Sequence, residues 1–170
     1  MYNWKLIDNF FLNYLRTIEN RIPKTDYGKE KLKPFFGVLF ETDNLYYVTQ
    51  ISSPKKRHEA LRPDIDFLKF YHQDKLLFVV NLNYMFPVPK DYIRDLTIND
   101  ILSVKNEQDA GKYIALLKRE LKLLNNSNIS EQALKLYQMV TENPDSKLAQ
   151  RCFKYRVLEA ACKNFILQQK

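Results

Sequence analysis

Glycine is scarce in this chain, since its 170 residues contain only Gly28, Gly37 and Gly111. No glycine-rich phosphate-binding loop is present, which argues against a nucleoside triphosphate or dinucleotide site. Tracts rich in Ser, Gly, Gln or Pro are also absent, so a flexible linker is not indicated. With 45% hydrophobic residues, residues 1–170 are expected to form one domain with a substantial core.

Cysteine is equally rare. Cys152 and Cys162 lie in a stretch that the pattern predicts to be one helix, about 15 Å apart along its axis, too far to pair. Because His58 and His72 are distant in sequence, no zinc set is predicted. We expect the cysteines to be core residues in a reducing compartment, and we expect no metal or other cofactor.

Long apolar runs are missing too. No stretch approaches the roughly 18 apolar residues of a membrane helix, and the N-terminus lacks the features of a secretory signal. We therefore expect a cytoplasmic protein with no membrane partner. The balance of 27 Lys and Arg against 20 Asp and Glu gives a net charge of +7, which favours polyanionic partners and is compatible with RNA.

The first half of the sequence predicts strands. Trp4 and Leu6 alternate as in a strand, and Asp8 could cap a following helix. Aromatic and β-branched runs then predict two hairpins, 35–40 with 45–51 and 65–71 with 76–80, turned at 41–44 and 72–75.

The second half predicts helices. Apolar residues recur on one helical face from Ala110 to Leu124, with Glu120 placed elsewhere around the helix. Two further helices are predicted at 130–140 and from Ser146 through Phe165. Strands early and helices late indicate an α+β fold: a compact, twisted, mostly antiparallel sheet with helices packed on it.

Chemistry is most strongly indicated at the end of the first hairpin. Ser52, Ser53, Lys55, Lys56, Arg57 and His58 provide hydroxyls, cations and an imidazole just beyond a strand. Lysine and arginine stabilise developing phosphate charge, and hydroxyls can orient an attacking group. The RNA 2′-hydroxyl can itself attack phosphorus, so the protein need not supply a nucleophile. The alternative is a polar, solvated turn.

A second basic segment precedes the hairpin. Tyr27, Lys29, Lys31 and Lys33 offer a phenol and three ammonium groups that the hairpin could bring near Ser52. A solvated linker is the alternative.

Three other groups allow more than one interpretation. His58 could shuttle a proton, although a single histidine is thin support for that role. Asp64 and Asp66 could suggest a metal pair, but strand-edge charges fit better because further ligands are lacking. Asn83, with Tyr84, could contact an unpaired base or could equally cap a strand end.

Several segments occur in an order that resembles one family. They are 33–39 (KPFFGVL), Tyr46-Tyr47, 52–55 (SSPK), 81–88 (NLNYMFPV), 151–154 (RCFK) and Leu158-Glu159. In this order they are similar to the ToxN/AbiQ family over nearly the whole chain. The resemblance implies a sheet related to the MazF/Kid toxin fold.

The resemblance also implies a function. It implies a bacterial type III toxin–antitoxin toxin, a metal-independent endoribonuclease that cuts cellular or phage mRNA and acts in phage defence by abortive infection. Its partner would be a repeat-derived, pseudoknotted antitoxin RNA that binds and neutralises it directly. Whether protein and RNA close into a ring stays open, and DNA is not an expected partner. The competing interpretation is a non-catalytic RNA-binding regulatory module that uses the same basic surface.

Candidate site residues follow from the matched motifs. The family's hydroxyl-x-lysine core falls on Ser52, Ser53 and Lys55, although Ser52 stands where many relatives carry threonine. Lys33 and Tyr27 are expected to join this core in catalysis. The predicted RNA-binding residues are Lys29, Lys31, Lys56, Arg57, His58 and Asn83.

Overall fold

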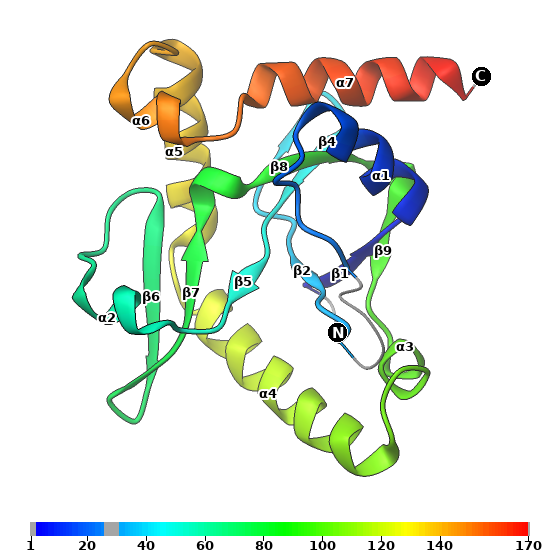
Figure 1. The fold of residues 1–170 in the computed structure, drawn as a ribbon, viewed down its shortest axis with the longest axis vertical. Coiled ribbons are helices and arrows are strands. Elements are labelled where there is room, and N and C mark those ends of the chain that lie inside the picture. Colours follow the sequence, from blue (N-terminus) through cyan, green and yellow to red (C-terminus); the bar gives the residue numbers. More distant parts are fainter. Residues whose placement is uncertain (1–2, 26–30, 170) are drawn as a thin grey trace.

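The computed structural model describes residues 3–25 and 31–169, with the strands lying before Leu96 and the longest helices after it (Figure 1). The strands are β1 (Trp4–Ile7), β2 (Phe35–Phe36), β3 (Glu41–Thr42), β4 (Leu45–Val48), β5 (Ile51–Ser52), β6 (Phe67–His72), β7 (Lys75–Asn81), β8 (Phe86–Pro89) and β9 (Ile93–Asp95). The helices are α1 (Asn9–Ile18), α2 (Lys56–Ala60), α3 (Ile98–Leu102), α4 (Glu107–Asn125), α5 (Ile129–Glu142), α6 (Lys147–Arg151) and α7 (Tyr155–Gln168), with 3-10 turns η1 (Leu82–Tyr84) and η2 (Lys90–Tyr92). The predicted α+β class and helical C-terminal half are confirmed.

The described strands pair antiparallel, as predicted, but they form three small sheets where one sheet was expected, with the orders β2-β1-β9, β3-β4-β8 and β5-β7-β6. The strands form separate small sheets because each is short and neighbouring segments of the chain pair with different partners. Phe36, for example, pairs with Trp4 of β1 and also bridges to Thr49 beyond β4. The likeness to the MazF/Kid core stays a prediction.

Both predicted hairpins form, but with tighter turns than expected. Asp43-Asn44 and Gln73-Asp74 all have positive φ, between 46° and 63°. Paired positive φ angles are typical of two-residue turns that match the twist of the flanking strands. Of the residues expected in the turns, Glu41 and Thr42 therefore belong to β3, His72 belongs to β6 and Lys75 belongs to β7.

The predicted helix from Ser146 through Phe165 is wrong as one element, because it breaks between α6 and α7. In the break, the Phe153 N–H donates to the Asn83 carbonyl at 2.9 Å, and Asn83 Nδ2 donates to the Arg151 carbonyl at 3.1 Å. Contacts with η1 thus replace helical hydrogen bonds. Cys152 lies in the break and Cys162 lies in α7, and both are buried free thiols.

Helix α7 fastens one end of the molecule, where it lies against α1 and β8 (Figure 1). Phe165 packs on Phe11 with ring centroids 5.2 Å apart. Buried Glu159 accepts hydrogen bonds from the hydroxyls of Tyr47 (2.9 Å) and Tyr137 (2.7 Å). These contacts join α7 to β4 and α5, while α4 crosses the opposite end. Within the described residues, none of the helices has the length and apolar character required to span a membrane.

Candidate active site

A cavity of about 420 Å³ lies between α4 and the ends of β2 and β5. Lys33 and Ser53, which were predicted as catalytic from separate parts of the sequence, both line it. Lys31 lines it as well. The two predicted segments, the basic one before β2 and the hydroxyl-lysine one after β5, therefore meet at one place.

Ser53 reaches the cavity because of strand alternation. β5 pairs with β7 through Ile51 opposite Val80 and Ser52 opposite Val79. Successive side chains of a strand point to opposite faces, and Ile51 and Ser53 line the cavity whereas Ser52 between them does not. The two predicted serines thus differ, because only Ser53 faces the space in which a substrate could sit.

The backbone of Lys33 is held on both sides. Its N–H donates to the Thr25 carbonyl at 2.9 Å, and its own carbonyl accepts from Gln50 Nε2 at 2.8 Å. Burial lowers the pKa of the Lys33 ammonium, and the positive charge of Lys55 lowers it further. Lys33 is therefore a half-buried cation that loses its proton more readily than an ordinary surface lysine.

Glu120 is a site residue that the sequence interpretation missed. It was placed away from the apolar face of its helix, but on α4 it is only 7% exposed and lines the cavity with Lys33. Burial raises the pKa of its carboxyl to about 7, while the charge of Lys33 acts in the opposite direction. Its spacing from Leu117 and Leu124 was the available signal, since these residues share a helical face.

Tyr113 is a second residue that was not predicted for the site. Its hydroxyl donates to the Leu32 carbonyl at 2.7 Å, and Lys105 Nζ lies 4.9 Å from the centre of its ring. Burial raises the pKa of the phenol. Tyr113 therefore joins α4 to the segment that carries Lys33.

The segment after Pro54 folds as helix α2 and is not a polar, solvated turn. The Lys55 N–H donates to His58 Nδ1 at 3.1 Å, and the His58 N–H donates to the Lys55 carbonyl at 2.7 Å. His58 is only 4% exposed, and burial is the main cause of its lowered pKa. The interpretation of His58 as a surface RNA contact is corrected accordingly, whereas Lys55, Lys56 and Arg57 are exposed.

Asn83 and the acidic pair lie elsewhere in the fold. The Asn83 side chain holds the break between α6 and α7, and Asn83 is not among the residues that line the cavity. Asp64 and Asp66 both accept hydrogen bonds from Arg151, at 2.8 and 2.6 Å. The aspartates are therefore charges that fasten α6 to the start of β6, in line with the preferred interpretation of the sequence.

Two predicted positions, Tyr27 and Lys29, lie outside the described residues.

The cavity thus combines the Lys33 ammonium, which can bind phosphate, the Ser53 hydroxyl, and the Glu120 carboxyl, whose pKa is raised to about 7. The family model described as "Toxin ToxN, type III toxin-antitoxin system" matches residues 4–163. The chain belongs to this family. The comparison with curated proteins finds no match.

Solved structures share the fold. One, described under "A processed non-coding RNA regulates a bacterial antiviral system", has a TM-score of 0.77 at 19% identity and covers 96% of this chain and 98% of its own. A second, concerned with selective toxin inhibition by a non-coding RNA pseudoknot in bacterial type III systems, has a TM-score of 0.74 at 20% identity, with 96% of each chain covered. The third is AbiQ, a lactococcal anti-phage endoribonuclease of the type III system, with a TM-score of 0.78 at 14% identity, covering 99% of this chain and 98% of its own.

Proposed function

We propose that residues 1–170 of this type III toxin form a single endoribonuclease domain. The enzyme is metal-independent and acts in the bacterial cytoplasm. The observation that carries the proposal is that Lys33 and Ser53 line one cavity together with Glu120. Additional support comes from the fold shared with AbiQ, which is described as an endoribonuclease. Cellular and phage mRNAs are the substrates, and phage defence is the biological role.

The cleavage step needs in-line geometry and charge stabilisation. The substrate's 2′-oxygen attacks the adjacent phosphorus, the bond from phosphorus to the 5′-oxygen breaks, and a 2′,3′-cyclic phosphate forms. The 2′-hydroxyl proton passes to a base, and the departing 5′-oxygen gains a proton to become a 5′-hydroxyl. Lys33 and Lys55 stabilise the phosphate oxygens, and the Ser53 hydroxyl positions the phosphate.

Glu120 fits the role of a group that tunes Lys33. When ionised, its carboxylate favours the protonated lysine, and its charge is one of the influences on the Lys33 pKa. With its own pKa near 7, Glu120 changes charge in the range in which the enzyme would work. Ser52, whose side chain does not line the cavity, would act on β5 by holding Ser53 in register.

A direct-binding antitoxin RNA inhibits the toxin by covering this cavity and the exposed cations beside it. The exposed cations are Lys55, which precedes α2, Lys56 and Arg57 on α2, and Lys31 at the cavity. A folded RNA with closely spaced phosphates suits such a set of cations. The related structure concerned with inhibition by an RNA pseudoknot supports the same class of partner.

The function is tested with purified, antitoxin-free protein and a mixed RNA pool in the presence of a chelator. We expect discrete cuts with 2′,3′-cyclic phosphate and 5′-hydroxyl ends, and loss of cutting in Ser53→Ala. Intact RNA that nevertheless binds the protein would favour a non-catalytic module. Cuts that leave 5′-phosphates, or that require added metal, would overturn the mechanism.

A further inference from the structure

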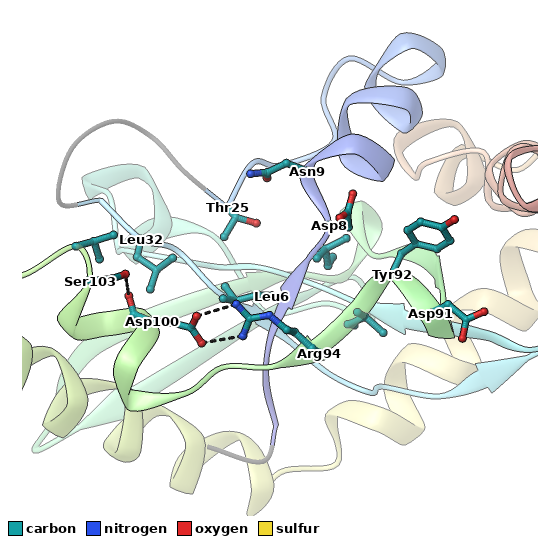
Figure 2. A pocket seen from close by; sticks show the side chains of 13 residues that line it. Leu6, Asp8, Asn9, Thr25, Leu32, Asp91, Tyr92, Arg94, Asp100 and Ser103 are labelled. Atoms are coloured by element: carbon teal, nitrogen blue, oxygen red, sulfur yellow. Dashed lines mark hydrogen bonds and ion pairs between the residues drawn. The ribbon is translucent and has the colours of Figure 1, made fainter. Parts of the chain in front are cut away.

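Figure 2 shows a second cavity, of about 830 Å³, and its lining residues place it next to the candidate active site. Leu32 lines both cavities, and Val104 lines this one while the next residue, Lys105, lines the active site. Thr25, in the wall of the second cavity, accepts the backbone hydrogen bond of Lys33. An RNA strand with a phosphate at Lys33 would therefore bring a neighbouring nucleoside to this cavity.

The charge of the second cavity differs from that of the active site. Asp8, Asp91 and Asp100 line it, and the cation that lines it, Arg94, is paired with Asp100. Excess carboxylate disfavours a phosphate group, but carboxylates accept hydrogen bonds from the exocyclic amino groups of bases. Asp8 is suited to this, because its helix-capping bonds from Phe10 and Phe11 both go to Oδ1.

Arg94 and Asp100 form a fixed flat wall. The guanidinium donates to both carboxylate oxygens of Asp100, at 2.8 and 2.7 Å, as Figure 2 shows. These bonds are the main reason why the pKa of Asp100 lies well below its usual range. The Arg94 side chain is 59% exposed although it is paired, and guanidinium planes stack on unpaired bases.

Thr25 supplies an independent sign of a ligand. The residue is only 7% exposed, and its Oγ1 is a buried atom without a hydrogen-bond partner among the described residues. Figure 2 shows this hydroxyl directed toward the side of the cavity on which Asp8 lies. A buried hydroxyl left unpaired destabilises the fold, and a bound group with a polar edge would remove that cost.

We propose that this cavity is a base-specificity site: it holds one unpaired base of the RNA, a base with an exocyclic amino group, next to the phosphate at Lys33. The amino group donates to the carboxylates, the ring stacks against Arg94, and the Thr25 hydroxyl pairs with the polar edge of the base. Leu6, Leu32 and Val104 supply apolar contact to the ring. The inference rests on the proposed ribonuclease function and assigns it a source of sequence preference.

The test compares base preference in the full-length protein, in Thr25→Val and in Asp91→Asn. Thr25→Val keeps the shape of the side chain, and Asp91→Asn removes a charge at an exposed residue. Asp145→Asn, at an exposed residue outside the cavity, is the matched control. Cleavage rates are measured on RNAs that carry each of the four bases at every position flanking the cut, and thermal midpoints establish folding.

We expect the wild type and Asp145→Asn to prefer adenine, guanine or cytosine over uracil at one flanking position. Each cavity variant should reduce that preference roughly tenfold, mainly by slowing cleavage of the preferred RNA. Preference at all positions unchanged in both variants, or no preference in the wild type, would overturn the inference and leave the ribonuclease function intact. If the wild type cuts nothing, the proposed function fails. The base-specificity site is then tested by binding: affinities are measured for the same RNAs with every 2′-hydroxyl blocked, and an affinity preference that is absent in the wild type or unchanged in both variants would overturn it.

Discussion

Two buried carboxylates, at opposite ends of the molecule, have different surroundings. Glu159, under α7, accepts hydrogen bonds from two tyrosine hydroxyls and from Arg156. Glu120, on α4, lines a cavity beside Lys33, and its pKa is raised because burial outweighs that cation. A buried charge with a full set of donors fastens a structure, whereas a buried charge at a cavity wall changes its protonation easily. The first end is the scaffold and the second is the site.

The largest expected effect is at the site. Lys33→Met keeps the aliphatic stem and removes the cation, so cleavage should fall by roughly 10²–10³-fold. The thermal midpoint should stay near that of the wild type. Lys118→Met, at an exposed residue of the same helix as Glu120, is the control and should cleave normally. Equal loss of activity in both variants would show that Lys33 has no special role.

At the scaffold end, the expected effect is on stability. Glu159→Ala leaves the hydroxyls of Tyr47 and Tyr137 without their acceptor and should lower the free energy of unfolding by about 3 kcal/mol. Denaturant titration measures this loss. On a Tyr47→Phe, Tyr137→Phe background the same change should cost clearly less. Cleavage per folded molecule should be unchanged, and a catalytic defect would break the distinction between the two ends.

The pH dependence of stability sharpens the contrast. The pKa of Glu120 is raised from 4.5 to about 7, so its protonated form stabilises the fold below pH 4.5, and this contribution is lost as pH rises through about 7. Glu120→Gln should remove that slope and be more stable at pH 8 by up to about 3 kcal/mol. Glu142→Gln, at an exposed residue, should keep the slope. A slope that persists in Glu120→Gln would assign it to another group.

The smallest expected effect concerns the exposed cations of α2. Lys56→Glu with Arg57→Glu should weaken RNA binding for all sequences alike, and the slope of log affinity against log salt should fall by roughly 0.7 for each phosphate that the protein no longer neutralises. The same reversal at Lys147 and Lys154, near the break between α6 and α7, is the control. Weakening that depends on RNA sequence would indicate base recognition at α2.

Local sequence patterns predicted much of the fold because turns and caps are local. The Asp8 cap, both hairpins and the extents of α4 and α5 required only neighbouring residues. The break after α6 could not be predicted, since it depends on Asn83, far away in sequence. The three small sheets likewise depend on long-range choices of partner.

The candidate site was predicted in part. The motifs placed Lys33 and Ser53 together, and the structure brings both to one cavity. Which of two adjacent serines faces it depends on the register of β5 with β7. The burial of Glu120 and His58 could not be predicted from charge or polarity, because a polar residue is buried when its neighbours in space, which the sequence does not give, cover it.

The central claim, that the cavity at Lys33 and Ser53 promotes attack by the RNA's own 2′-hydroxyl, is tested most directly on a substrate that the wild type cuts at one known bond. A single 2′-methoxy group replaces the hydroxyl adjacent to that bond, and cleavage there is measured against the unmodified RNA. The predicted result is complete loss of cutting at that bond alone. Continued cutting there, with a 5′-phosphate on the product, would contradict the account.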